Sequence, residues 1–196
     1  QSETFEVENN PLHPEEGTHT VTFSRELWIE GEDFLSQPVP KYKRLYPNGP
    51  ECRLKGAYLI KCVGYETDEN GNVTEIAAEY DPDSRGGNPA DGRKVKGATI
   101  HWVDASTAVD AEVRLYDNLF SDPEPDGLGK DFLECLNPGS LEVLTGCKVE
   151  AGLSDAQPSD SFQFLRQGYF CADSKDSKPG HLVFNRSVSL KDSFKP

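Results

Sequence analysis

Residues 51–81 read ECRLKGAYLIKCVGYETDENGNVTEIAAEYD, and this stretch decides the fold. Two runs rich in β-branched, aromatic and small apolar residues meet at Asn70-Gly71, a dipeptide that accepts the positive φ of a tight turn. Strand-length runs on both sides of such a turn are typical of a β-hairpin. We therefore predict strands over 51–64 and 72–81.

The rest of the chain repeats this pattern. Seventeen glycines and fourteen prolines interrupt the 196 residues, and the intervals between them are short and rich in Val, Ile, Thr, Tyr and Phe. Frequent turn residues between short β-prone runs predict an all-β fold. Residues 130–136, KDFLECL, read as a short helix that ends before Asn137-Pro138. Further strands are expected over 20–30, 41–46, 93–103, 108–117, 141–149, 160–171 and 181–190.

Two composition breaks suggest the domain organisation. Residues 121–130, SDPEPDGLGK, and the proline-rich residues 36–40 each read as a linker or an exposed loop. Sheets with many strands avoid open edges by closing into barrels, and two barrels of about 90 residues fit this length. We therefore expect one β-barrel over 34–120 and a second, discontinuous β-barrel made of residues 1–33 and 121–196.

The charge is unevenly distributed along the chain. The formal net charge is −14, which argues against a nucleic-acid partner on bulk charge alone. Residues 41–96, however, hold ten basic and nine acidic side chains, so the acidity lies outside them. Residues 41–61, the basic strip, hold six bases, the single acid Glu51 and three tyrosines. Bases beside stackable rings suit single-stranded nucleic acid, although a solvated face of a β-domain would have the same composition.

Motifs for catalysis and for metal binding are missing from the sequence. It contains no GxSxG, Walker or GxGxxG motif, and Gly86-Gly87 lacks the Lys-Ser/Thr that a phosphate cradle needs. The five cysteines fit neither a disulfide framework nor a CxxC site, so we expect reduced thiols, no metal and no catalytic site in this chain. No window approaches the roughly 18 apolar residues of a membrane helix. The lack of methionine suggests a piece of a longer protein.

A family resemblance runs in order from residue 7 to residue 194. The chain resembles the C-terminal anticodon-binding region of glutaminyl-tRNA synthetase, a class I aminoacyl-tRNA synthetase. The related glutamyl enzyme of archaea and eukaryotes shares this region and stays open as an alternative. The stretches that carry the resemblance are FSRELWIEGEDF (23–34), KYKRLYPNGPECRLKGAYLIKC (41–62), EYDPDSRGGNPADGRKVKGATIHWV (79–103), AEVRLYDNLF (111–120), SFQFLRQGYFCADS (161–174) and VFNRSVSLKD (183–192).

This resemblance implies two anticodon-binding β-barrels, the discontinuous one proximal to a catalytic domain and the other distal from it. The HIGH and KMSKS-type signatures of that catalytic domain are absent from the sequence. ATP is therefore implied only for a missing catalytic domain, and no cofactor is implied for this chain. The implied partners are a glutamine-specific tRNA and the catalytic domain in cis. The implied protein is a cytoplasmic monomer that binds neither DNA nor a membrane.

The resemblance also implies roles for particular residues. Lys43, Arg44 and Arg53 match positions that contact the anticodon, with Arg53 at the first base and Arg44 at the third. Gln163, in the FQF motif, matches a glutamine that contacts the central uracil. A further arginine of that uracil pocket is implied upstream of residue 1.

Two departures from the family pattern leave some contacts open. Lys41 and Lys55 are also predicted to bind the anticodon region. Lys41 stands where a glutamine is common, however, and Lys55-Gly56 replaces an Arg-Asn pair, so which contacts they make near the third base and the nucleotides after it stays open. Arg166 is a candidate either for a phosphate contact or for a surface ion pair. Tyr42 either stacks on a base or packs in the core.

The chemistry of these side chains supports the assignments without the family. Arginine presents a planar fork of donors to a base edge or a phosphate, whereas lysine presents a point charge. Glutamine offers both a donor and an acceptor, as a uracil edge requires. On strands, Arg53 and Lys55 would share one face, and Lys41 and Lys43 would likewise share a face. The alternative function is a non-catalytic β-domain whose basic strip binds an acidic protein partner.

Overall fold

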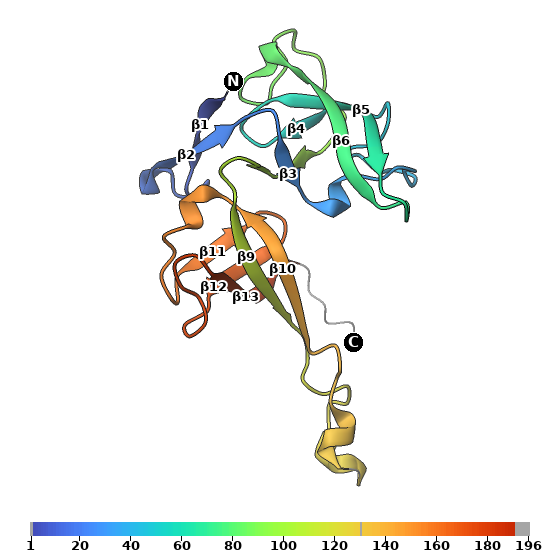
Figure 1. The fold of residues 1–196 in the computed structure, drawn as a ribbon, viewed down its shortest axis with the longest axis vertical. Helices are drawn as coiled ribbons and strands as arrows, with labels where there is room; N and C mark the ends of the chain where they lie inside the picture. The colour runs from blue at the N-terminus through green and yellow to red at the C-terminus, as the bar shows by residue number, and fades with distance from the viewer. Residues whose placement is uncertain (1, 130, 191–196) are drawn as a thin grey trace. The chain divides into compact units, whose positions relative to one another are not determined.

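The computed structural model describes residues 2–129 and 131–190. Its elements of five or more residues are all β-strands, and its helical elements are 3-10 turns of three or four residues within these ranges. The all-β prediction is therefore confirmed. The chain divides into two compact units, Gln1–Thr107 (unit 1) and Ala108–Pro196 (unit 2), which are drawn in Figure 1.

Unit 1 is built from three sheets. Its strands are β1 (Glu3–Glu8), β2 (Thr18–Phe23), β3 (Leu27–Ile29), β4 (Cys52–Leu54), β5 (Leu59–Thr67), β6 (Val73–Asp81), β7 (Thr99–Ile100) and β8 (Trp102–Asp104). The largest sheet has the order β6-β5-β4-β7, in which β4 pairs antiparallel with β5 and parallel with β7. Two smaller antiparallel pairs, β1 with β2 and β3 with β8, complete the unit.

The predicted hairpin around Asn70-Gly71 is confirmed, and Figure 1 shows it as the long β5-β6 pair. The Asp68 carboxylate accepts the backbone N–H groups of Asn70 and Asn72 at 2.9 and 2.8 Å. Gly71 closes the turn with a φ of +84°, a conformation that favours glycine. The first predicted arm of the hairpin is interrupted at Gly56, which also has a positive φ, so that it forms β4 and β5 instead of one strand.

The core of unit 1 includes the first two strands of the chain. The rings of Phe5 and Phe23 lie 5.6 and 5.2 Å from the ring of Tyr58, measured between centroids. Phe23 also packs edge-to-face against the buried Trp102 at 5.4 Å. Aromatic pairs at these distances bury large apolar areas and favour such tilted arrangements. The hairpin of β1 and β2 is therefore part of the unit 1 core.

The observed division of the chain differs from the expected one. The composition breaks place residues 1–33 with 121–196, but the structure divides the chain after Thr107. The break at 121–130 lies inside unit 2, in the connection between its first two strands. Composition identifies exposed loops, whereas the membership of a core depends on which apolar faces meet. Loop composition does not contain that information.

Unit 2 is built around one five-stranded sheet. Its strands are β9 (Val109–Tyr116), β10 (Leu141–Val149), β11 (Ser161–Phe164), β12 (Gly168–Ala172) and β13 (Leu182–Ser189). The sheet has the order β10-β9-β13-β12-β11, and β13 runs parallel to β9 while the other neighbours are antiparallel. The core side chains include Val113, Phe170, Leu182 and Phe184. In the described residues of both units the sheets are open, so backbone hydrogen bonds do not close the expected barrels.

The strand predicted over 41–46 is wrong. Lys41 has a φ of +69°, and the segment makes one isolated bridge, between Phe34 and Leu45. Prolines flank the segment on both sides, and proline cannot donate to a strand ladder. The alternation argument that places Lys41 and Lys43 on one strand face therefore does not apply.

Two further local predictions are corrected by the structure. Of the strand predicted over 93–103, only β7 and β8 are strands, and residues 93–98 are irregular. The helix predicted over 130–136 is a 3-10 turn, Phe132–Cys135, and Lys130 lies outside the described residues. An Asp131 side chain that accepts the Leu133 N–H caps this turn.

Candidate nucleic-acid interface

The seven predicted site residues are divided between the two units. Gln163 and Arg166 lie in unit 2, and the other five lie in unit 1. Within unit 1 the structure brings two segments together at Ala98. The Ala98 N–H donates to the Lys43 carbonyl at 2.7 Å, and the Ala98 carbonyl accepts the Arg53 N–H at 3.0 Å. The unit 1 members are Lys41, Lys43, Arg44, Arg53 and Lys55.

Arg53 lies at the centre of β4, between β5 and β7. Its backbone is fixed on both sides, because it pairs with Leu59 of β5 and Thr99 of β7. Its half-buried side chain donates from Nε to the Gly87 carbonyl at 2.8 Å. This bond orients the guanidinium and engages Nε, so the Nη groups are the donors that can face a ligand.

Lys55 lies in the turn that follows β4, beyond the strand on which the sequence places it. Its N–H donates to the Ile100 carbonyl at 3.0 Å, and its carbonyl accepts the Trp102 indole N–H at 3.0 Å. Cys52 and Leu54 are buried, whereas the residues that alternate with them are half-buried. Arg53 therefore lies on the face of β4 that is opposite the core, and Lys55 follows in the turn after the strand.

Arg44 is tied to two acidic residues. Its Nε lies 3.2 Å from Asp33 Oδ1, and its Nη1 lies 3.3 Å from Glu32 Oε1 and 3.2 Å from the Glu32 carbonyl. The Asp33 side chain has no solvent exposure, and a buried carboxylate is costly without a cationic partner. Arg44 therefore has a structural role that the sequence did not predict.

The segment around Arg44 carries one oriented ring and two exposed lysines. Tyr42 is half-buried, its hydroxyl donates to the Glu32 carbonyl at 2.9 Å, and burial raises its pKa to about 12. Its ring lies 6.3 Å from that of Tyr46. Lys41 and Lys43 are exposed on either side of Tyr42. The segment is held by these side-chain bonds together with single backbone hydrogen bonds, among them those from the Leu45 N–H to the Asp33 carbonyl and from the Ala98 N–H to the Lys43 carbonyl.

Arg93, which the sequence did not predict as a site residue, holds three carboxylates beside β4. Its Nε and Nη2 donate to the two Glu51 carboxylate oxygens at 3.0 and 2.8 Å. Its Nη2 also donates to Asp81 Oδ2 at 2.6 Å, and its Nη1 donates to Asp91 Oδ1 at 3.0 Å. Hydrogen bonds from Arg93 to Asp81, and from the Arg93 N–H to Asp91, lower the pKa values of these two carboxyls. Arg93 thereby binds Glu51, which is the single acid of the basic strip.

In unit 2, the FQF motif forms the edge strand β11. Phe164 stacks on Phe170 at 4.4 Å, and Phe162 packs edge-to-face on Phe184 at 5.9 Å. Gln163 lies between the two phenylalanines in sequence and is exposed. Alternation along β11 therefore directs the Gln163 amide away from the core, where it is available to a ligand.

Two features near Gln163 complete the unit 2 part of the site. Tyr169 of β12 is paired with Gln163 across the strands and is 47% exposed, a position that sequence reasoning missed. The signal for it was the GYF motif, in which the residue between Gly168 and Phe170 alternates outward. Arg166 lies in the turn between β11 and β12, is half-buried, and has a φ of +65°. Such a backbone conformation is rare for residues other than glycine.

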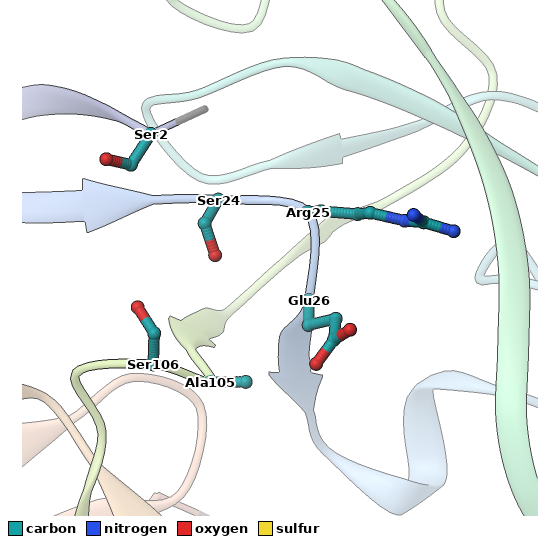
Figure 2. Close-up of a pocket in the computed structure, with 6 residues that line it drawn as sticks. All are labelled: Ser2, Ser24, Arg25, Glu26, Ala105 and Ser106. Atoms are coloured by element: carbon teal, nitrogen blue, oxygen red, sulfur yellow. The ribbon is translucent and has the colours of Figure 1, made fainter.

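A separate pocket of about 400 Å³ lies in unit 1. Figure 2 shows the Ser24 and Ser106 hydroxyls directed toward one another across it, with the Arg25 side chain directed away from them. The other residues of its lining are Ser2, Glu26 and Ala105. None of the seven predicted site residues lines this pocket, so it is distinct from the candidate interface.

Within residues 2–129 and 131–190 there is no group of three or more His, Cys, Asp or Glu side chains that could hold a metal ion. No disulfide links the five cysteines. None of the helical elements described is long and apolar enough to cross a membrane.

Comparisons with known proteins agree with the residues that carry the resemblance. Two family models match, both described as tRNA synthetases class I (E and Q), anti-codon binding domain, over residues 1–81 and 99–173. A glutamine-tRNA ligase of Pseudomonas syringae pv. tomato is 53% identical over 94% of this chain, and one of Clostridioides difficile is 50% identical over 99%. One of Vibrio cholerae is 54% identical over 98%.

These relatives are longer proteins. The chain spans 32%, 35% and 34% of their respective lengths, which is about a third in each case. The matches nevertheless cover nearly all of this chain, including both units and all seven predicted site residues. The chain therefore belongs to the anticodon-binding domains of the class I tRNA synthetases for glutamate and glutamine.

Proposed function

We propose that this chain reads the anticodon of a glutamine-specific tRNA as part of a glutamine-tRNA ligase. The observation that carries the proposal is Arg53, whose backbone is fixed between two strands and whose guanidinium is oriented by the Gly87 carbonyl. Rigid placement of a donor fork is what direct reading of a base edge requires. The 50% to 54% identity to glutamine-tRNA ligases favours glutamine over the glutamate alternative.

The proposed contacts divide by chemistry. Arg53 would use its Nη groups on the first anticodon base, and Arg44 would contact the third. Lys41, Lys43 and Lys55 would contact phosphates as point charges, which position the RNA without reading it. This set lies on unit 1, where the basic strip is locally positive although the chain as a whole is acidic.

In unit 2, Gln163 would contact the central uracil through its amide. Tyr169, directly opposite it, would offer a ring on which a splayed base can stack. Arg166 would contact a backbone phosphate. These roles extend the proposal to both units without requiring a particular arrangement of one unit on the other.

The remaining chemistry of the reaction is proposed for other parts of the longer protein. ATP and glutamine would bind in its catalytic domain, in cis to this chain. The chain itself would take no cofactor and no metal. We propose a cytoplasmic monomer whose nucleic-acid partner is tRNA, not DNA.

Arg53→Met in the full-length ligase tests the proposal. A lost bidentate base contact costs about 1 to 3 kcal/mol, so discrimination at one anticodon position should fall by about five- to 150-fold. The matched control is Lys61→Met, which removes one exposed charge of the basic strip on β5. The control variant should lower the affinity for all tRNAs about equally. Unchanged selectivity of Arg53→Met at every anticodon position would contradict the proposed role.

A further inference from the structure

The segment that connects β6 to the strands β7 and β8 contacts residues 51–53 at two points, one on β4 and one on the residue before it. The first is the hydrogen bond from Arg53 Nε to the Gly87 carbonyl, at 2.8 Å. The second is the bidentate bond from Arg93 to the Glu51 carboxylate, at 2.8 and 3.0 Å. Residues 85–93, which include both points, are called the cover loop.

The first contact depends on two consecutive glycines. Gly86 and Gly87 have φ values of +88° and +86°, which residues with a side chain rarely adopt. Their N–H groups donate to the Ala57 and Ser84 carbonyls at 2.7 and 2.8 Å, which ties the glycine turn to the connection between β4 and β5 and to the 3-10 turn Pro82–Ser84. A Cβ added at Gly87 would lie 3.8 Å from Arg53 Cδ, so the loop backbone runs close beside this side chain.

The second contact lies close to the first, on the residue that precedes β4. Glu51 precedes Arg53 by two residues, and the segment 97–98 continues alongside both, because the Gly97 N–H donates to the Glu51 carbonyl and the Ala98 carbonyl accepts the Arg53 N–H. Residues two apart on an extended chain project to the same face. Glu51 and Arg53 therefore share the face that the cover loop crosses.

Arg93 closes this arrangement from the other end of the loop. Besides Glu51 it binds Asp81, the last residue of β6, and Asp91 within the loop. One guanidinium thus faces three carboxylates and connects the loop to the end of β6 and to the residue before β4. Without it, Glu51 would be an unpaired acid two residues from Arg53, able to bind the Arg53 guanidinium and to repel an RNA phosphate.

We propose that Arg93 is a positioning residue for anticodon reading: it holds the cover loop and Glu51 in place, so that the Gly87 carbonyl orients Arg53 toward the base. This inference rests on the proposed function of Arg53. Arg93 itself touches no base in this scheme. Its effect on recognition passes through Arg53 and is therefore confined to the anticodon position that Arg53 reads.

The first test does not involve tRNA. In the chain labelled with ¹⁵N, the Arg53 Nε–H signal should show slowed hydrogen exchange because of its bond to Gly87. Arg93→Ala should remove this protection. Arg114→Ala, which removes an arginine with the same number of carboxylate partners from unit 2, is the matched control and should leave it intact. Retained protection in Arg93→Ala would overturn the positioning role.

The second test measures discrimination between anticodons by the full-length ligase. Arg93→Ala should reduce discrimination by about tenfold at the position affected by Arg53→Ala, as expected for residues coupled through one network. In the Arg53→Ala background, Arg93→Ala should cause no further loss. Arg93→Lys should restore part of the discrimination, because it keeps a cation but not the fork. Arg114→Ala should leave discrimination unchanged.

A milder variant distinguishes the positioning role of Arg93 from an effect of Arg93→Ala on the stability of the fold. Glu51→Gln keeps the size of the side chain and removes one charge from the Arg93 contact. It should increase affinity for all tRNAs, since an acid is removed from the basic strip, yet reduce discrimination at the Arg53 position. If discrimination stays unchanged, the inference is wrong even where Arg93→Ala unfolds the chain.

The two proposals fail in distinguishable ways. If Arg53→Ala leaves discrimination unchanged, the proposed function of Arg53 is wrong. If Arg53→Ala reduces discrimination and Arg93→Ala does not, or if their effects add, Arg53 reads the base without help from Arg93. The second result overturns this inference and leaves the proposed function in place.

Discussion

Unit 1 and unit 2 each gather three carboxylates around one arginine, but the two clusters differ in burial and in what they hold. In unit 1, Arg93 is 36% exposed and fixes a loop beside β4. In unit 2, Arg114 of β9 is 21% exposed and binds carboxylates of its own strand and of the turn after β12. The partners of Arg114 are Glu112 at 2.7 Å, Asp176 at 2.7 Å and Asp173 at 3.6 Å.

The difference shows that position, not composition, decides what such a cluster does. The Arg114 cluster joins a turn to the middle of a sheet, and Asp173 also accepts the Asn185 side-chain amide at 2.7 Å from β13. The Arg93 cluster lies on the face of β4 that carries Arg53. We therefore expect the unit 2 cluster to affect stability alone, and the unit 1 cluster to affect recognition as well.

We expect the largest loss of stability from a substitution that disrupts the unit 1 cluster by displacing the backbone. A Cβ at Gly97 would lie 2.1 Å from the Glu51 carbonyl and 2.8 Å from Cys52 Sγ, so Gly97→Ala must separate β4 from its neighbour and move Glu51 away from Arg93. Overpacking of this severity costs about 3 kcal/mol or more. Urea unfolding that is monitored by tryptophan fluorescence reports on unit 1, because both tryptophans lie there. Gly31→Ala is the control, since nothing lies within 4 Å of its added Cβ. Equal midpoints for the two variants would contradict this prediction.

Removal of the central arginine of unit 2 should have the next largest effect. Arg114→Met leaves the largely buried Glu112 and Asp173 carboxylates without their cation, and we expect a loss of about 2 kcal/mol. Amide hydrogen exchange in β9 and β13 measures this loss of stability. The control is Lys148→Met, which breaks a more exposed ion pair with Asp110 and should cost less than about 1 kcal/mol. If both variants lost the same stability, the Arg114 cluster would be no more than a surface pair.

Low pH should weaken both clusters. For unit 2 the pH range in which stability is lost follows from the pKa of one carboxyl. Hydrogen bonds from Asn185 and from two backbone N–H groups lower the pKa of Asp173 from 3.8 to about 2. A carboxyl with a depressed folded pKa contributes stability above its unfolded pKa, and that contribution is lost as pH falls through the folded pKa. Unit 2 should therefore lose stability between pH of about 4 and about 2. Urea midpoints measured across this range should vary less with pH in Asp173→Asn than in the exposed control Asp155→Asn.

Removal of metal ions is expected to have no effect on the stability of the chain. Both clusters are rich in carboxylates, but a guanidinium occupies the place that a cation would take in each. Addition of a chelator should therefore leave the melting temperature of the chain unchanged. Differential scanning fluorimetry with and without the chelator tests this. A fall in melting temperature that zinc restores would show a metal site.

The sequence predicts the fold best where local signals agree with the tertiary contacts. In the β5-β6 hairpin, the apolar runs and Asn70-Gly71 encode the same structure, so the prediction is correct. Residues 41–46 also alternate like a strand, but the bond from Arg44 to the buried Asp33 holds them in an irregular conformation. That bond joins positions eleven apart in an irregular segment, and no periodicity reveals it. Tertiary context therefore overrides the local pattern.

The candidate site is predicted in part for the same reason. The outward position of Arg53 follows from alternation along β4, whereas the sequence did not predict the turn that places Lys55 beyond this strand. The role of Arg93 does not, because its partners come from the region before β4, from the end of β6 and from its own loop. The outward position of Tyr169 was accessible from the GYF motif, but its pairing with Gln163 required the register of β11 and β12.

The strand order of unit 2 has a consequence for how the protein folds during synthesis. β13 is the last strand in the sequence, yet it lies in the middle of the sheet, between β9 and β12. β11 and β12 can pair across a short turn, but they join β9 only after β13 has left the ribosome. Closing such long-range contacts is slow, and unpaired strand edges attract other chains meanwhile. Unit 1, whose strands are all complete by Asp104, can fold earlier, so translation rate and chaperone access should matter most for unit 2.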